Sequence, residues 1–364
     1  LVDGIEVRAG TTGQNLVANP DFETGSANWW MQGNHSRSSR ETGTGYLSSG
    51  CLHVRASNRM WTGDNSCQFA LLSNTLQQGQ TATLRLRARW LKGAREILLR
   101  LNGNWLEVVG PMDIPRNLGT PGARNSRAVT AAPPAIYEVT HSPSLPAGYQ
   151  PAVVTARFHS AYGLRNAYLY YRVDPSASYT AVALRDTGTG GDWVANDGVF
   201  SGTIPGQPAG TLVAFYVDAS DNLFNIARYP ALFDNTRPVR ECLIRFGDPE
   251  PGGSFAAYHL WISQTNVTRW SAMSDLSNEL HDGTFVSGSR VIYNVEARFA
   301  GSPYHQGFDS PAGNLCHYKW VFPDDNKFLG ASSFNKLHQP GNGAGDDLSL
   351  QREQIANSFL RRLG

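Results

Sequence analysis

The stretch from Asp186 to Gly198 combines residue types that can bind a cation. It holds Asp186, Asp192 and Asp197, together with Asn196 and four glycines. Carboxylate and amide oxygens are the ligands that hard cations such as Ca²⁺ prefer, and glycine lets the backbone curl around them. The stretch therefore predicts a calcium site held by the three aspartates. Asp and Gly are also the ordinary residues of turns, so a turn without a metal is the alternative.

A second set of residues that could do chemistry lies near the C-terminal end. Lys319 occurs in a strand-like run, residues 315–322, and Glu353 in a helix-like run, residues 348–363. A lysine on a strand and a glutamate on the next helix form the pair that grips nucleotide phosphates in kinases. On this helix Arg352 projects from the middle of the apolar stripe and Glu353 from its edge. The alternative is that Lys319 lies on a solvated sheet face and Glu353 on a helix surface.

The elements that must position these residues follow from their periodicity. Residues 290–299 alternate with period two, which predicts a strand whose one face carries Val291, Tyr293, Val295, Ala297 and Phe299. The run 315–322 alternates in the same way and places Cys316, Tyr318, Trp320 and Phe322 on one face. The helix has apolar residues at helical spacing, namely Leu348, Ile355, Ala356, Phe359, Leu360 and Leu363.

Four segments occur here in order: YNVEARFAGSPYH, CHYKWVFPDD, FNKLH and SLQREQIANSFLRRLG. Together they resemble the N-terminal part of the CotH family, atypical kinases first known from spore coats, over roughly residues 258–364. The resemblance implies a kinase-like α+β part whose nucleotide-binding residues are Arg298, Ser302, Lys319, Arg352 and Glu353. It also implies that ATP and Mg²⁺ bind only in a longer parent protein. The family's catalytic carboxylates would follow Gly364, so this chain alone is expected to be inactive.

The N-terminal part resembles a different family. The segment NLVANPDFETG, followed by Trp29 and Trp30, is similar to the start of jelly-roll carbohydrate-binding modules. The resemblance implies a sandwich over residues 14–127, with a structural Ca²⁺ near Asp21 and Glu23. It also implies that Trp29, Trp30 or Trp61 stacks against sugar rings. The alternatives are that Glu23 only accepts hydrogen bonds and that the tryptophans are packed in the core.

The remaining chain completes a mainly β architecture. Residues 1–13 are expected to form the last strand of a preceding module or an N-terminal strand. A linker at 128–134 precedes an immunoglobulin or fibronectin III-like spacer at 135–247, predicted from short strands separated by turn signals. A second linker at 248–254 leads to the kinase-like part at 255–364. The expected order is therefore jelly roll, immunoglobulin-like sandwich and α+β lobe.

Composition and charge favour some classes of protein and argue against others. Charged residues make up only 17% of the 364 residues, and 37 glycines and 20 prolines indicate many turns, as in extracellular β proteins. The formal charge of +1, without a basic stripe interleaved with aromatics, argues against nucleic-acid binding. No apolar run approaches the roughly 18 residues that span a bilayer. The placement of Cys51 and Cys67 on either side of an expected hairpin centred near Arg59 predicts a disulfide between them, with free thiols as the alternative.

Two functions are consistent with these features. The first is a fragment of a large secreted or cell-surface protein that combines β-sandwiches with the nucleotide-binding half of a CotH-like kinase. The second is a non-enzymatic extracellular scaffold or adhesion protein that binds a polysaccharide or another cell-surface component. In both cases we expect the chain to be an internal part of a longer polypeptide, so that neighbouring modules are among its partners.

Overall fold

The computed structural model describes residues 1–56, 67–69, 72–101, 106–114, 122, 128–232, 237–250, 257–273, 277, 279–300, 311 and 318–336. Within these residues the chain forms antiparallel sheets and one α-helix, which confirms the predicted mainly β fold class. The helix spans eight residues, and no helix in the described part of the chain is long and apolar enough to cross a membrane.

The chain divides into two compact units, which are described separately. Unit 1 comprises Leu1–Ala132 with Leu276–Glu279, and unit 2 comprises Pro133–Asp275 and Leu280–Gly364. The division after Ala132 falls inside the predicted linker at 128–134. The linker predicted at 248–254 lies within unit 2, which holds both the part predicted to be immunoglobulin-like and the C-terminal part.

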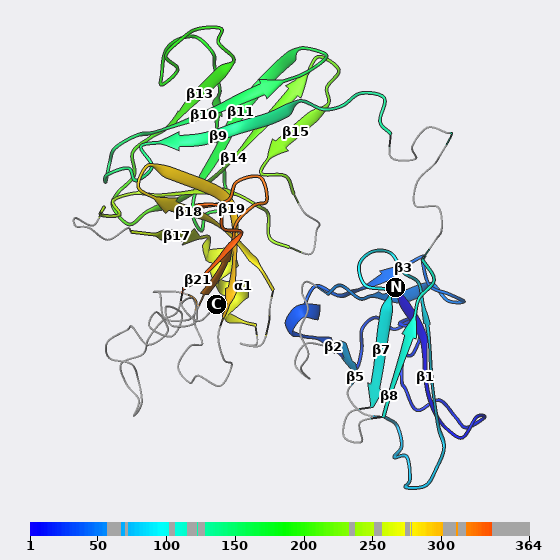
Figure 1. Ribbon diagram of the computed structural model, residues 1–364. Coiled ribbons are helices and arrows are strands. Elements are labelled where there is room, and N and C mark those ends of the chain that lie inside the picture. Colours follow the sequence, from blue (N-terminus) through cyan, green and yellow to red (C-terminus); the bar gives the residue numbers. More distant parts are fainter. Residues whose placement is uncertain are drawn as a thin grey trace, which may run out of the picture. The chain divides into compact units, whose positions relative to one another are not determined.

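In unit 1 the largest sheet has the strand order β3-β4-β1-β6 (Figure 1). These strands are β1 (Val2–Ala9), β3 (Ser39–Thr42), β4 (Gly50–His53) and β6 (Ala82–Ala88). The described part of the unit also contains two strand pairs and a short 3₁₀ helix: β2 (Trp29–Met31) with β5 (Cys67–Phe69), β7 (Glu96–Leu101) with β8 (Leu106–Pro111), and η1 (Gly33–His35). The strand expected within residues 1–13 is therefore β1, which pairs with β4 and β6 inside unit 1. The buried core residues are Val2, Ile5, Val7, Val17, Phe22 and Leu52.

The predicted disulfide between Cys51 and Cys67 is absent, since both thiols are free. Cys51 lies in β4 opposite Glu41, and its Sγ is 3.2 Å from the hydroxyl of Thr44. Cys67 lies in β5 opposite Met31, in a different sheet. The two cysteines are therefore not cross-strand neighbours, which their spacing in the sequence had suggested. Burial raises the pKa of Cys67 to about 11, which keeps this thiol protonated near neutral pH.

Unit 2 begins with two sheets, in green in Figure 1. One has the order β13-β10-β9, and the other the order β12-β11-β14-β15, with β16 also paired to β14. Their bounds are β9 (Ala135–Ser142), β10 (Ala152–His159), β11 (Leu164–Val173), β12 (Thr180–Ala183), β13 (Val199–Ile204), β14 (Leu212–Asp221), β15 (Ile226–Tyr229) and β16 (Cys242–Arg245). The sequence predicts strands here at 153–158, 166–173, 180–184, 199–204 and 211–219, and β10 to β14 match them to within two residues at each end. Alternating side chains from these sheets share one core that includes Val154, Leu169, Ile204, Phe215 and Val217.

A five-stranded antiparallel sheet follows in the same unit, with the order β17-β18-β19-β20-β21. Its strands are β17 (His259–Ile262), β18 (His281–Ser287), β19 (Arg290–Phe299), β20 (Tyr318–Val321) and β21 (Ser333–Lys336). The helix α1 (Gln264–Ser271) connects β17 to β18, and the Ser263 hydroxyl caps it by accepting from the Asn266 N–H. Trp270 of α1 is buried in the core beneath this sheet. The predicted helix at 348–363 lies outside the described residues.

A bulge in β19 changes the predicted alternation of side chains. Asn294 adopts a left-handed φ of 59°, and the register against β18 shifts between Gly283 and Phe285. As a result Ile292 packs in the core of the C-terminal sheet, while Tyr293 packs in the core of the first two sheets. One strand thus belongs to two cores, which explains why the two predicted domains form a single unit.

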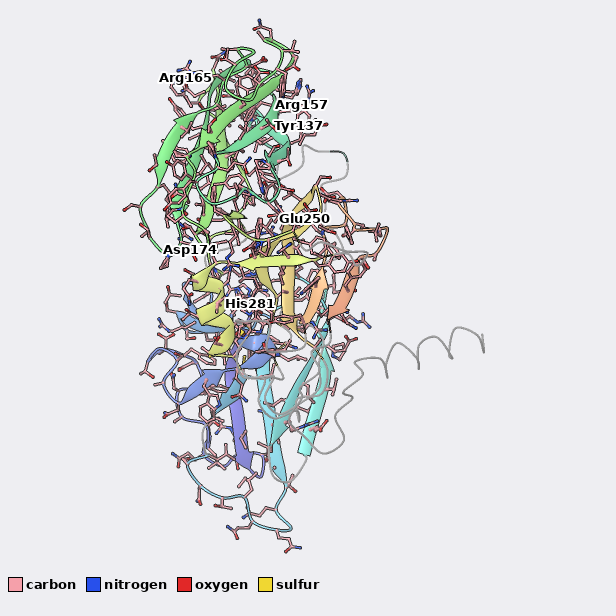
Figure 2. The ribbon with its side chains drawn as sticks, turned by 90° about the vertical axis from the view of Figure 1, so that its left-hand side faces the viewer. Tyr137, Arg157, Arg165, Asp174, Glu250 and His281 are labelled. Atoms are coloured by element: carbon pink, nitrogen blue, oxygen red, sulfur yellow. The ribbon has the colours of Figure 1, made fainter. Side chains whose placement is uncertain are left out.

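A buried charge network also joins the first two sheets of unit 2 to the helix α1. The Arg172 guanidinium donates from Nε to Glu241 at 2.7 Å and from Nη1 to Asp174 at 2.8 Å. Asp174 in turn accepts from the backbone N–H of Gln264 at 2.7 Å, at the start of α1 (Figure 2). Tyr179 donates its hydroxyl to Glu241 at 2.6 Å. The carboxylates raise the pKa of Arg172 above its ordinary value, so the network is held by a permanent charge.

Because His141 is buried, we expect the folded state of unit 2 to lose stability in acid. Burial lowers its pKa to about 4, and its ring contacts the Tyr293 hydroxyl at 2.5 Å and the Ser144 carbonyl at 3.1 Å. The unfolded chain binds this proton near pH 6.5, whereas the folded chain binds it only near pH 4. Stability should therefore fall between these values as the pH is lowered, by on the order of 3 kcal/mol.

The measurement is the free energy of unfolding of unit 2 against pH, compared between the unaltered chain and His141→Gln. Glutamine offers a neutral donor and acceptor at the same place, so the variant should show a shallower slope between pH 6.5 and 4. Buried His281, whose pKa burial lowers to about 3, gives both proteins a remaining slope. Identical slopes in the two proteins would show that His141 does not titrate as its burial requires.

Candidate functional site

The predicted acidic loop connects β12 to β13 and is fixed at its base. Arg185 and Ser201 pair through two backbone hydrogen bonds, and the Ser201 hydroxyl lies within hydrogen-bond distance of the Thr189 and Gly190 carbonyls. Gly191 has a φ of 105°, a conformation that side chains disfavour, and it packs against Val153 of β10. The loop thus folds back onto the sheet and does not extend freely into solvent.

The structure brings the three predicted aspartates together. Ligand atoms of Asp186, Asp192 and Asp197 all lie within 4.8 Å of one another. Two oxygens that each lie about 2.4 Å from one Ca²⁺ can be at most about 4.8 Å apart, so the spacing fits a shared ion. Asp192 is 4% exposed, Asp186 is half-buried and Asp197 is exposed, which leaves one side of the cluster open to solvent.

Backbone donors hold all three of these carboxylates in place, Asp197 by the N–H of Val199 at 2.8 Å. Asp186 accepts from the N–H groups of Asn196, Asp197 and Gly198, and Asp192 accepts from those of Gly188 and Val194. Each carboxylate has about four lone-pair positions, so these bonds leave acceptor capacity for a cation. The donors orient the oxygens and offset part of the repulsion between the like charges. The residues therefore fit a hard divalent cation.

The predicted calcium residues near the N-terminus, Asp21 and Glu23, both accept backbone hydrogen bonds. Glu23 accepts a short hydrogen bond from the Gly50 N–H at the start of β4, and Asp21 accepts from the Glu23 N–H at 3.4 Å. Within the described residues neither belongs to a group of three potential ligands, and the acidic loop forms the one such group. The geometry at Glu23 corresponds to the alternative in which it ties down the chain entry.

The tryptophans proposed to stack on sugars differ in environment. Trp29 packs against Phe22 at a ring-centroid distance of 5.2 Å and belongs to the border of the unit 1 core. Trp30, the next residue, is 43% exposed. Trp61 lies outside the described residues. Of the two tryptophans that the structure describes, Trp30 is therefore the one more open to a ligand.

The C-terminal sheet places two of the predicted nucleotide-binding residues side by side. Arg298 of β19 pairs directly with Lys319 of β20, and Lys319 pairs with Asn335 of β21. Their sequence neighbours Ala297, Phe299, Tyr318 and Trp320 are buried in the sheet core, so Arg298 and Lys319 project from the opposite face. Both are half-buried, and burial lowers the pKa of Arg298. The result is a pair of cations next to an exposed amide.

The same face of the sheet also carries two acidic residues, Glu296 and Asp282. Glu296, two residues before Arg298, forms an ion pair with Arg237 at 3.0 Å. Asp282 of β18 lies opposite Glu296 and pairs with Arg240 at 2.9 Å. These acids are thus engaged by other arginines. The three other predicted residues, Ser302, Arg352 and Glu353, lie outside the described residues.

Sequence reasoning missed the residues that brace the acidic loop from other strands. Arg157 of β10 donates to the Asp197 carbonyl at 3.0 Å and pairs with Glu138 at 2.9 Å. Figure 2 shows it next to Tyr137, its partner across the two strands. Asp197 is 40 positions away in the sequence, so only the strand register reveals the contact.

Comparison with known proteins adds no assignment. No family model matches the chain, and no curated protein matches it.

Proposed function

We propose that the acidic loop of unit 2 binds Ca²⁺ and that the chain is part of a secreted or cell-surface multidomain protein. The observation that carries the proposal is the convergence of Asp186, Asp192 and Asp197 within 4.8 Å on a loop held by backbone donors. Three carboxylates this close repel one another, and a divalent cation removes that repulsion. When bound, the ion stabilises the loop between β12 and β13 and serves no catalytic step.

Calcium titration by isothermal calorimetry tests the proposal. Asp186→Asn keeps an acceptor oxygen for the N–H groups of Asn196 and Asp197 but removes one charge and the oxygen that accepts from Gly198, so we expect it to weaken Ca²⁺ binding by at least about tenfold. The matched control is Asp218→Asn, which removes an aspartate of β14 outside the cluster and should leave the affinity unchanged. Equal binding by the unaltered chain and Asp186→Asn would refute the site.

The pairing of Arg298 with Lys319 favours a second candidate function. It supports the resemblance to the nucleotide-binding half of a CotH-like kinase, in which cations meet the phosphates of ATP. In this candidate Lys319 and Arg298 hold a phosphate group on the open face of the C-terminal sheet. A scaffold or adhesion role through a polysaccharide stays the alternative, with Trp30 as its contact.

Lys319→Met should weaken the binding of ADP by about tenfold or more, because the methionine keeps the length of the side chain but removes the cation. The measurement is the dissociation constant of ADP from calorimetric titration. Lys327→Met is the matched control, because Lys327 is an exposed lysine between β20 and β21. Equal ADP affinities for the two variants would remove Lys319 from the phosphate site.

A further inference from the structure

The outer face of β6 in unit 1 carries a regular row of arginines. Arg85 and Arg87 of β6 and Arg89, one residue beyond its end, alternate with side chains of the other face, and all three are exposed. A period of two along a strand places successive guanidinium stems about 6.7 Å apart. In the described residues β6 lies at the end of its sheet, so the row occupies an edge.

An exposed apolar loop adjoins this row. Tyr46 and Leu47, between β3 and β4, are 60% and 89% exposed. The Arg87 guanidinium lies over the Tyr46 ring at 5.3 Å, which places the loop beside the arginines. Buried Asp3 fixes the loop, since its carboxylate accepts from the Tyr46 N–H at 2.7 Å and the Ser48 hydroxyl at 3.1 Å. The apolar side chains are therefore presented on a rigid turn.

The acids near the row are already engaged. Glu6 accepts from Arg8 at 3.1 Å and lies 3.9 Å from Arg85, its cross-strand neighbour. The Asp3 carboxylate already accepts hydrogen bonds from the loop that contains Tyr46. Among the described residues, no carboxylate forms an ion pair with Arg87 or Arg89. The face therefore carries an excess of positive charge beside exposed apolar groups.

We propose that this surface, formed by Arg85, Arg87, Arg89, Tyr46 and Leu47, docks on a bilayer rich in anionic phospholipid. Basic side chains are attracted to the negative surface of such a bilayer, and adjacent aromatic and aliphatic side chains enter its interface. The nearly complete exposure of Leu47 favours a lipid surface over a soluble polyanion, which would use the arginines but not the leucine. This inference concerns unit 1 and is independent of the calcium proposal.

Co-sedimentation of the whole chain with vesicles tests the inference. Vesicles of phosphatidylcholine with about one-quarter phosphatidylglycerol should bind the chain, and pure phosphatidylcholine vesicles should bind it at least about tenfold more weakly. Combined replacement of Arg85, Arg87 and Arg89 by glutamine should reduce binding to the anionic vesicles by at least about tenfold. Leu47→Ser should also reduce it. The controls are Arg95→Gln and Val109→Ser, exposed residues elsewhere in unit 1 that should have no effect.

Equal binding to both kinds of vesicle, or no effect of the arginine replacements, would overturn the inference. So would tighter binding of a soluble acidic polysaccharide that is unaffected by Leu47→Ser, because that result assigns the arginines to a polyanion. Raising the salt concentration provides a test without any variant. Vesicle binding by the unaltered chain should weaken as salt screens the arginines, and salt-independent binding would contradict the electrostatic part.

Discussion

Arg172→Met is expected to lower the free energy of unfolding of unit 2 by about 3–5 kcal/mol. The substitution preserves much of the side-chain volume but leaves Asp174 and Glu241 buried without their cation, with side-chain exposures of only 4% and 6%. It also loosens the start of α1, because Asp174 accepts from the Gln264 N–H. Denaturant unfolding of the purified variant measures the effect.

The control for this prediction is Arg85→Met in unit 1. The Arg85 side chain is 56% exposed and forms its ion pair with Glu6 at 3.9 Å, so its loss should cost less than about 1 kcal/mol. If Arg172→Met proved as mild as Arg85→Met, the buried network would not be what joins the first sheets of unit 2 to α1.

Gly191→Ala should destabilise unit 2 by about 2–5 kcal/mol and abolish calcium binding. An added Cβ would meet Val153 Cγ1 at 2.1 Å, and the φ of 105° is itself unfavourable for alanine. Relief of the clash requires the backbone before Asp192 to move, which separates the three carboxylates. Unfolding measurements and calcium titration of the same variant test both effects.

The neighbouring Gly190 provides a close control. It also has a positive φ, 69°, but a Cβ built there meets no atom within 4 Å. Gly190→Ala should therefore cost only about 1 kcal/mol, from its backbone conformation, and should keep the calcium affinity. Equal effects of the two substitutions would mean that the contact with Val153 does not position the loop.

Much of the secondary structure was predictable because it depends on local alternation. The run 290–299 forms β19 with the bounds that its period-two pattern predicted. The face assignment failed within that strand, because nothing in the local pattern indicates that Asn294 adopts a left-handed conformation. The bulge reverses the orientation of Val291 and Tyr293, so that both pack against the core of the first two sheets of unit 2.

In the candidate site, too, the sequence identified residues that are close along the chain but not contacts between distant ones. The three aspartates were identifiable because they lie within 12 positions on a glycine-rich stretch. The contacts of Arg157 with Asp197 and of Arg172 with Glu241 were not, since each joins residues at least 40 positions apart. The prediction for Cys51 and Cys67 failed for a related reason: sequence symmetry about a hairpin does not show which sheet each strand joins.

Thermal unfolding with and without Ca²⁺ tests the central claim most directly. A cation that binds only the folded loop adds RT ln(1 + [Ca²⁺]/Kd), about 2.7 kcal/mol at one hundred times Kd. Calcium should therefore raise the Tm of unit 2 by several degrees over the chelated protein. In Asp192→Asn this shift should be lost, while Asp218→Asn should retain it. A Tm that does not respond to Ca²⁺, or responds equally in Asp192→Asn, would contradict a calcium site at Asp186, Asp192 and Asp197.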